Sequence, residues 1–278
     1  SAVTNTAPVI NVSNATFTVT LSAGNDVNVL ISFNVTDADG AGDINASTAV
    51  VNFTLGGRDG GQFYTNISAV STSEFGTCTN NSPSNTFVNI TCKVVLPYFA
   101  NQSGAWVVNI SVKDRAGAVG RNDTVTFTIN TLSSLSLPYA AINFSSVFLL
   151  QQDVAANLPI ILNNTGNDDF DQINISAAPL VGTTVTSESV GVTQFYANIT
   201  NAVAGLGVRL ETTAVTLREL VQVTGLDNVT LIHGHTRAFA PNADKGNRSI
   251  FFWVDVPASG LSSQLYNATW NVTVINIP

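Results

Sequence analysis

Hydrophobic and polar residues alternate along most of this chain in short runs, and turn-forming residues separate the runs. Because successive side chains of a strand point to opposite faces of a sheet, a period of two predicts β-strands with one buried face. In the first half, the alternation predicts strands at residues 9–12, 17–21, 28–35, 49–55, 63–69, 87–96, 105–112 and 124–129. Short strands at this spacing favour a sandwich or barrel over βαβ units.

The second half of the chain repeats this pattern. Strands are predicted there at residues 140–150, 158–162, 172–177, 194–199, 208–210, 229–232, 250–256 and 265–277, and residues 214–221 suit either a helix or a strand. A Ser- and Leu-rich stretch precedes Pro138 between the halves. We therefore expect a linker at residues 131–138, one domain at residues 1–130 and a second at residues 139–278.

Several segments resemble known surface proteins. The apolar-polar run 107–112, its Asp114-Arg115-Ala116-Gly117 turn and the strand 124–129 resemble the last two strands of immunoglobulin-like modules in prokaryotic surface proteins. Segments 163–176, 251–257 and 269–274 resemble the β-sandwich repeats of archaeal cell-surface, S-layer-type and extracellular filament proteins. The resemblance implies an all-β fold with two immunoglobulin-like β-sandwich domains in tandem.

Asn-x-Ser/Thr sequons are far more frequent than the composition explains. The 278 residues contain nineteen, whereas chance gives roughly six. The sequon asparagines are Asn11, Asn14, Asn34, Asn45, Asn52, Asn66, Asn80, Asn89, Asn101, Asn109, Asn122, Asn143, Asn163, Asn174, Asn198, Asn228, Asn247, Asn267 and Asn271. The excess indicates an exported chain that carries N-linked sugars.

The middle residue of a sequon indicates how the sequon lies. In fourteen of the nineteen it is apolar, as in Asn-Val-Thr or Asn-Ile-Ser. In a strand, the asparagine and the hydroxyl residue then share the outer face, and the middle residue points into a core. The alternative is that these are polar-apolar-polar strand sequences that are never modified.

Charge is sparse in this sequence. Charged residues make up 10% of the chain, the mean hydropathy is +0.25 and the net charge is −8. With only three lysines and no basic cluster, nucleic acid is not an expected partner. No apolar run reaches about 18–20 residues, so we expect no membrane insertion. The start Ser1-Ala2-Val3 is the kind of end that signal-peptide removal leaves, which agrees with an extracellular or cell-surface location.

Cys78 and Cys92 are the two cysteines. In an exported chain two cysteines most simply form a disulfide, and the alternative is two buried free thiols. Three aspartates, Asp37, Asp39 and Asp43, alternate with small residues in one loop. Calcium prefers such an oxygen-rich loop, whereas the simpler interpretation is a hydrated turn. Otherwise no cofactor is expected beyond the covalent N-glycans.

Two further groups of polar residues have weaker interpretations. The acidic segment 167–171 is expected to be a solvated loop. His233 and His235 are the two histidines, and we expect a surface loop there, with a metal site as the alternative. No motif of a hydrolase, zinc protease or phosphate-binding loop occurs, so no enzyme is expected.

The sequence thus predicts a structural subunit of a glycosylated extracellular polymer, a filament or an S-layer, whose partners are copies of itself. The N-terminal segment would complete a neighbour's sheet, with Val3, Asn5, Ala7 and Val9 on the inserted face. Contacts between copies are expected in the sequon-free tracts 1–10, 146–162, 177–197 and 201–227. The alternative is a monomeric glycosylated adhesin or receptor-like binding module.

Overall fold

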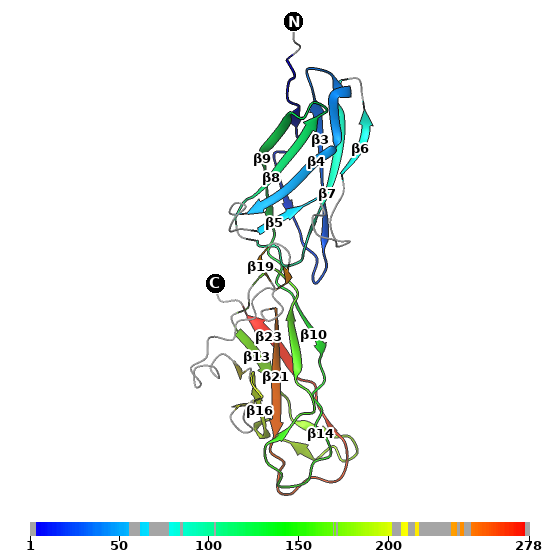
Figure 1. Cartoon of the computed structure of the whole chain (residues 1–278). Helices are drawn as coiled ribbons and strands as arrows, with labels where there is room; N and C mark the ends of the chain where they lie inside the picture. Colours follow the sequence, from blue (N-terminus) through cyan, green and yellow to red (C-terminus); the bar gives the residue numbers. More distant parts are fainter. Residues whose placement is uncertain are drawn as a thin grey trace. The chain divides into compact units, whose positions relative to one another are not determined.

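The computed structural model describes residues 4–55, 62–66, 78–83, 86–102, 104–168, 170, 172–201, 207–210, 215–216, 235–237, 240–241 and 246–275. Within these ranges the chain forms β-strands and two short 3-10 turns, Ala41–Asp43 and Val192–Gln194, and it forms no α-helix. The fold is therefore all-β, as the alternation predicts (Figure 1).

The chain divides into two compact units. The first unit contains Ser1–Ser133, Gly166–Asp168 and His235–Pro241, and the second contains Ser134–Thr165, Asp169–Gly234 and Asn242–Pro278. The chain passes from the first unit to the second after Ser133, which lies inside the predicted linker. Most of that predicted linker does not connect domains, however, because Leu135–Tyr139 forms strand β10 of the second unit.

The first unit consists of two sheets. One sheet has the order β1-β3-β7-β6 and contains β1 (Val9–Asn11), β3 (Val27–Thr36), β7 (Val88–Leu96) and β6 (Cys78–Pro83). The other has the order β2-β9-β8-β4-β5 and contains β2 (Thr16–Val19), β9 (Val119–Ile129), β8 (Trp106–Asp114), β4 (Ile44–Leu55) and β5 (Gln62–Thr65). A two-stranded ribbon of β19 (His235–Arg237) and β20 (Ala240–Pro241) also belongs to this unit.

The strand order of the first unit is that of an immunoglobulin-like sandwich. Strands β1, β3, β7 and β6 take the places of strands A, B, E and D, and β4, β8 and β9 take those of C, F and G. The opening strand is divided between the sheets: β1 pairs antiparallel with β3, whereas β2 runs parallel to β9. The predicted fold class is thus confirmed by the topology.

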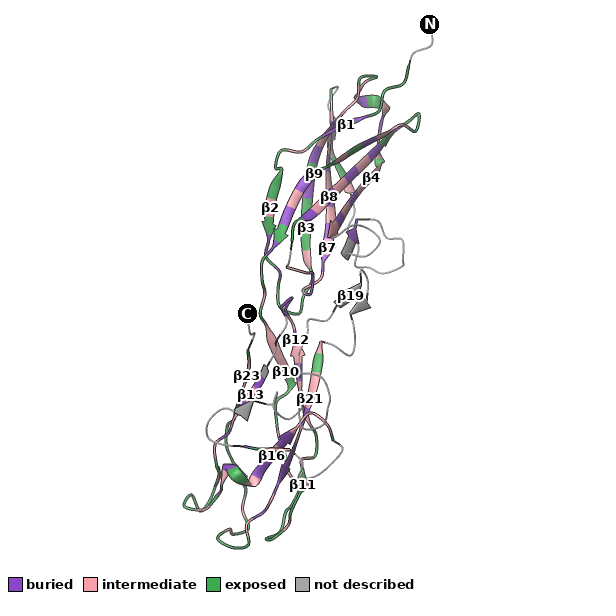
Figure 2. Ribbon diagram, turned by 90° about the vertical axis from the view of Figure 1, so that its left-hand side faces the viewer, coloured by how far each residue is buried: buried purple, intermediate pink, exposed green. Residues whose placement is uncertain are grey.

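The core of the first unit follows the alternation in the sequence. Along β7 every second residue from Val88 to Leu96 is buried, and the residues between them are half-buried (Figure 2). Trp106 and Phe127 are buried between the sheets and stack with ring centroids 5.6 Å apart. Tyr64 stacks on Trp106 at the same separation. Aromatic rings therefore fill the middle of this sandwich.

The second unit is also a layered β structure. Its largest sheet contains β10, β12 (Ile160–Asn164), β21 (Asn247–Val254), β16 (Phe195–Asn198) and β17 (Val208–Arg209) in that order, and β11 (Val154–Ala155) also pairs with β21. A second sheet has the order β18 (Val215–Thr216), β13 (Gln172–Ser176) and β23 (Asn271–Ile275). A small third sheet contains β15 (Ser189–Val190), β14 (Leu180–Gly182) and β22 (Tyr266–Asn267).

Two strand predictions for this unit were wrong. Residues 140–150, predicted as a strand, contain no strand and end in a turn. The backbone N–H of Gln151 donates to the carbonyl of Phe148 there, and Leu150 has a φ of 64°. The predicted strand 265–277 is divided into β22 and β23, and residues 268–270 between them are irregular.

The acidic segment 167–171 differs from the solvated loop that its composition predicts. Asn167 and Asp168 are buried in the first unit, with 1% and 6% of their surface exposed. The amide of Asn167 accepts the backbone N–H of Leu132 at 2.7 Å and donates to the carbonyls of Ala100 and Asn130. Burial is possible because backbone groups satisfy both ends of the side-chain amide.

Candidate functional site

The sequons lie as their apolar middle residues predict. Twelve apolar middle residues are described, of which five are buried and five more are half-buried and packed against a core. The buried ones are Val35, Phe53, Ile90, Ile110 and Ile175, and the half-buried ones are Val12, Ala46, Phe144, Ile199 and Val272. Only Ala15 and Ala268 are exposed among these described positions. The middle residues therefore mark the cores of both units, and their asparagines point outward.

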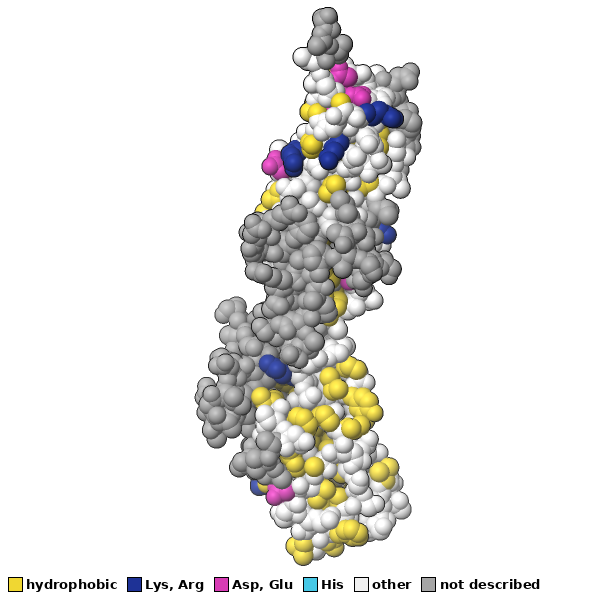
Figure 3. Space-filling model, viewed as in Figure 1, with side chains coloured by type: hydrophobic (Ala, Val, Ile, Leu, Met, Phe, Trp, Pro, Cys, Tyr) yellow, Lys and Arg dark blue, Asp and Glu magenta, His cyan; other side chains and the backbone are white. Residues whose placement is uncertain are grey.

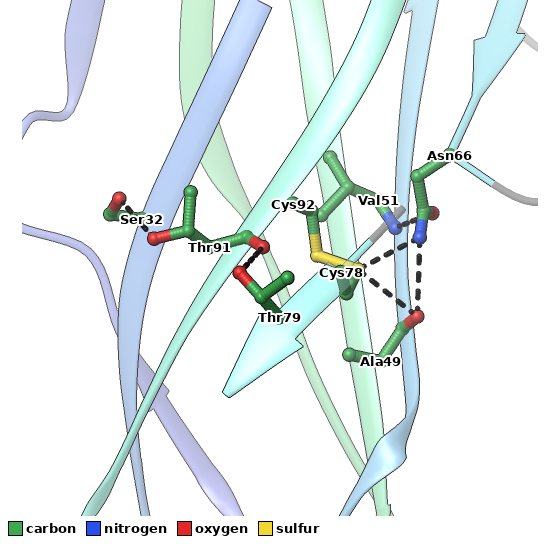
Figure 4. Close-up of a disulfide and its surroundings, with 8 residues drawn as sticks. All are labelled: Ser32, Ala49, Val51, Asn66, Cys78, Thr79, Thr91 and Cys92. Carbon is green, nitrogen blue, oxygen red and sulfur yellow. Dashed lines mark hydrogen bonds between the residues drawn. A yellow bond between two sulfur atoms is a disulfide. The ribbon is translucent and has the colours of Figure 1, made fainter. Parts of the chain in front are cut away.

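Asn66 is the exception, because its side chain is buried. Only 6% of its surface is exposed, and its amide oxygen accepts the backbone N–H of Val51 at 2.6 Å. The amide nitrogen, which would receive the sugar, donates to the carbonyl of Ala49 and to the sulfur of Cys78 (Figure 4). In the folded chain this nitrogen is therefore already engaged by protein groups. Asn228, by contrast, lies outside the described residues.

Several sequon asparagines oppose one another directly on neighbouring strands. In the first unit, Asn34 of β3 opposes both Asn11 of β1 and Asn89 of β7, which makes a row of three. On the other sheet, Asn52 of β4 opposes Asn109 of β8. In the second unit, Asn163 of β12 opposes Asn247 of β21. These rows are set by strand register, which the spacing of sequons along the chain does not reveal.

Exposed apolar side chains gather where sequons are missing. Eight of the twelve large hydrophobic side chains that are exposed among the described residues lie in the predicted sequon-free tracts: Val9, Val147, Phe148, Leu149, Leu150, Leu158, Val181 and Val185. Figure 3 shows hydrophobic side chains over much of the visible face of the second unit. Phe148 and Leu150 are 71% and 68% exposed at the tip of the turn that replaces the predicted strand. Leu150 adopts the left-handed backbone conformation there, which is unfavourable for a residue that carries a side chain, and this backbone conformation sets the position of the tip.

The two cysteines form the predicted disulfide. Cys78 of β6 opposes Cys92 of β7 directly, and their sulfur atoms are bonded (Figure 4). Strand β6 is the last strand of its sheet among the described residues, so the bond fixes an edge strand to the strand beside it. Cys92 is fully buried and Cys78 packs against the same core.

The three aspartates of the predicted calcium loop come together. Asp37, Asp39 and Asp43 each offer a carboxylate oxygen within 4.8 Å of the others, at the end of β3. One oxygen of Asp37 accepts the backbone N–H of Asp39 at 2.9 Å. Its other oxygen is enclosed by protein and has no hydrogen-bond partner among the described residues. The backbone carbonyl of Gly42 is engaged by Arg115 and is not free to join them.

The N-terminal segment binds its own domain in this structure. Strand β1 pairs with β3, and Ile10 is buried in the core while Val9 is 56% exposed. Asn5 donates to Asp114 at 2.7 Å, and the backbone N–H of Thr6 donates to Asp39 at 2.8 Å. Within its own domain the segment therefore buries the face opposite to the one predicted for insertion, since Asn5, Ala7 and Val9 are exposed. Val3 lies outside the described residues.

The strands of the second unit pair in the same order as those of the first, except that one strand of the first unit has no counterpart among the described residues. Its strands β10, β12, β21 and β16 correspond in pairing and in chain order to β1, β3, β7 and β6. Likewise β13 pairs with β23 as β4 pairs with β8. In the first unit β9 covers the other edge of β8. Among the residues described for the second unit, no strand takes that place beside β23.

The side chains of β23 are less buried than those of its counterpart. In β8, Val108, Ile110 and Val112 are at most 2% exposed. In β23, Val272 and Val274 are only half-buried, although both pack against the core of the second unit. A strand added beside β23 would supply the missing backbone hydrogen bonds and cover this edge.

One polar cluster could not be found from the sequence. Glu188 accepts hydrogen bonds from the hydroxyls of Tyr266 and Ser262, from the backbone N–H of Ser262 and from the amide of Gln264. These donors lie 74 to 78 positions away along the chain, and no motif connects them. They hold the pKa of the Glu188 carboxyl at about 2, with the Tyr266 hydroxyl as the largest cause.

Of the two histidines, His233 lies outside the described residues, and His235 is described only as part of the backbone of β19. The structure thus offers no description of the alternative metal site there. In the part of the chain that is described, no helix is long and apolar enough to span a membrane.

Comparison with known proteins finds distant structural likeness only. No family model and no curated protein matches the sequence. A chain from a chaperone–tip adhesin complex involved in the biogenesis of CFA/I fimbriae is 11% identical, with 95% of this chain and 96% of that chain covered and a TM-score of 0.33. The C-terminal domain of the AgI/II polypeptide BspA of Streptococcus agalactiae is 10% identical, with 90% and 91% covered and a TM-score of 0.19. Likeness this distant shows neither a family nor a function, and the resemblance to archaeal surface proteins stays a prediction.

Proposed function

We propose that this chain is a structural subunit of an extracellular, N-glycosylated polymer, and that its copies join by strand exchange. The observation that carries the proposal is the edge of β23 in the second unit, beside which no strand lies among the described residues, at the place where the first unit has β9. A sheet edge of this kind is a template for pairing with another chain. In a soluble, sparsely charged protein, such an edge needs a partner.

The partner that fits best is the N-terminal segment of another copy. Residues 4–7 form no strand in their own domain and are exposed. An extended segment beside β23 would gain backbone hydrogen bonds along the edge, and alternate side chains such as Val3 and Ala7 would approach Val272 and Val274. Because the donor and the acceptor lie on different parts of the chain, repeated addition gives an open filament rather than a closed dimer.

The sequon-free apolar tip at Phe148 and Leu150 supports the same proposal. Sugars on neighbouring strands would keep other proteins away from most outer faces. A contact between copies then falls on tracts that have exposed apolar side chains and no sequon. Phe148 and Leu150 meet both conditions.

Removal of the donor tests the proposal. A chain that lacks residues 1–7 keeps Pro8 and strand β1, so we expect it to fold as a monomer that does not polymerise. The variant Thr6→Ala, which changes an exposed side chain on the opposite face of the segment, is the control and should still polymerise. Intact fibres from the truncated chain, seen by electron microscopy, would refute strand donation by this segment.

The competing function is a glycosylated adhesin or receptor-like module that acts as a monomer. It predicts that native material elutes as single chains in size-exclusion chromatography, whatever the state of residues 1–7. A polymer that depends on those residues excludes this alternative.

We also propose that Asp37, Asp39 and Asp43 bind calcium. Calcium takes about six to eight oxygen ligands, of which three carboxylates supply a part and water supplies others. The enclosed, unpartnered oxygen of Asp37 is the observation that favours an ion over a hydrated turn. No enzymatic activity is proposed.

Calcium binding is tested by thermal unfolding with calcium and with a chelator. We expect calcium to raise the unfolding temperature of the wild type and to leave Asp37→Asn unchanged. Asp153→Asn, which alters an exposed aspartate of the second unit, should respond to calcium as the wild type does. An unfolding temperature that does not change with chelator would eliminate the site.

A further inference from the structure

The sequon asparagines that oppose one another on neighbouring strands limit which of them can carry a sugar. This limit cannot be derived from the sequence alone. Directly opposed residues on neighbouring antiparallel strands have Cβ atoms about 4.5–5.5 Å apart, and both side chains point to the same face. A sugar ring with its substituents is wider than the strand spacing of about 4.8 Å and needs water on both sides. Two N-linked sugars on directly opposed asparagines would therefore compete for one space.

We propose that opposed sequons are alternative sites, so that only one asparagine of each directly opposed pair carries a sugar. This inference rests on the proposal that the chain is glycosylated, and it assigns which sites are used. The bare members are Asn34, Asn109 and Asn163, and their modified neighbours are Asn11 and Asn89, Asn52, and Asn247, respectively.

The assignment in the row of three follows from position. Asn34 lies on the middle strand, so a sugar there would be flanked by Asn11 and by Asn89. Asn11 lies on β1, the last strand of the sheet among the described residues, and is exposed. A sugar on Asn11 would meet one opposed sequon, whereas a sugar on Asn34 would meet two.

The assignment on the other sheet follows from a hydrogen bond. The amide nitrogen of Asn109, the atom that would receive the sugar, donates to the hydroxyl of Thr54 at 3.0 Å. Thr54 is the hydroxyl residue of the opposing sequon, Asn52-Phe53-Thr54. The amide nitrogen of Asn109 is thus hydrogen-bonded to the sequon of Asn52. Asn52 is therefore the member of this pair that remains available for a sugar.

In the second unit, exposure decides between the two members. Asn163 lies on β12 between two strands, opposite Ser136 of β10 and Asn247 of β21. It is half-buried, whereas Asn247 is exposed at the beginning of its strand. A sugar on Asn247 therefore meets less protein than one on Asn163.

Glycopeptide mass spectrometry of the full chain from its native source, or from a host that glycosylates sequons, tests the proposal. We expect Asn34, Asn109 and Asn163 to be bare while the unopposed, exposed Asn14 and Asn267 are modified. Sugars on both members of an opposed pair in the same chain would overturn the proposal.

Substitution shows whether the neighbour is the cause. The variant Asn52→Gln removes one sequon, and we expect the modified fraction of Asn109 to rise severalfold. Asn247→Gln should likewise raise the modified fraction of Asn163. This variant gives a second measurement if the first variant folds poorly. Asn14→Gln, which removes an unopposed sequon, should leave both fractions unchanged.

The outcomes distinguish a failure of this inference from a failure of the proposal that the chain is glycosylated. If Asn109 and Asn163 stay bare in both variants, neighbouring sugars are not what excludes modification, and the inference is wrong although the chain is a glycoprotein. If every sequon asparagine is bare, the chain is not a glycoprotein, and both fail.

Discussion

Single asparagines in this chain have two opposite roles that the sequence does not distinguish. Most sequon asparagines point outward from strands, but Asn66 points inward and binds the backbone of β4. Asn167, which belongs to no sequon, is buried and binds three backbone groups in the same way. A side-chain amide can replace a missing backbone partner, because it carries both a donor and an acceptor.

Replacement of Asn66 by Ala should destabilise the first unit without changing its sugars. The backbone N–H of Val51 would lose its partner in a buried place, which costs about 1–3 kcal/mol. Urea unfolding measures the loss. The control Asn14→Ala, at an exposed position, should change the free energy of unfolding by less than about 0.5 kcal/mol. Equal stabilities of the two variants would contradict the assigned role.

Glu188 should make stability depend on pH in the acid range. Its pKa falls from 4.5 to about 2 in the folded chain, so folding favours the charged carboxylate. The stabilisation is complete above pH 4.5 and is lost as the pH falls through about 2. We expect Glu188→Gln to lower the unfolding temperature slightly at neutral pH, since the group is partly exposed to solvent. The difference from wild type should vanish near pH 2, and a constant difference would contradict the assignment.

At the scale of elements, strands with strict alternation were predictable and the rest were not. The predicted strand at 87–96 matches β7, because alternate residues from Val88 to Leu96 pack into one core. The predicted strand at 140–150 failed, because its apolar residues Phe148 and Leu150 lie exposed in a turn and have no core to face. Hydropathy alone does not tell a buried strand from an exposed apolar tip.

The candidate sites likewise divide into those that could be predicted from the sequence and those that could not. The disulfide and the aspartate loop were predictable, since Asp37, Asp39 and Asp43 lie within seven residues of one another. The opposition of Asn52 and Asn109 and the cluster at Glu188 depend on strand pairing between distant segments. Register between such segments is fixed by tertiary packing rather than by any local pattern.

The disulfide should stabilise the first unit through its edge strand. Cys78 and Cys92 close a loop with a sequence separation of 14, for which chain entropy gives about 3 kcal/mol. We expect the double variant Cys78→Ala/Cys92→Ala to unfold at lower urea concentration than the wild type. A reducing agent should lower the midpoint of the wild type and leave that of the variant unchanged. Insensitivity of the wild type to reduction would contradict this role.

At the scale of the whole molecule, sparse charge, sequons and open edges fit one account. Outward asparagines lie on the strands of both units, and under the proposed glycosylation their faces would be shielded by sugar. The apolar residues that remain exposed, such as Phe148 and Leu150, lie in tracts without sequons. Within the described residues, strand β23 of the second unit also has no neighbour at the edge where the first unit has β9. Together these features describe a subunit that is protected on most faces and adhesive on a few.

A density map of the native assembly by electron microscopy tests the central claim most directly. The account predicts fibres in which an extended segment from a neighbouring copy pairs with β23 along Asn271–Ile275. Single particles of one chain each, or an assembly in which that edge of β23 faces solvent, would contradict it.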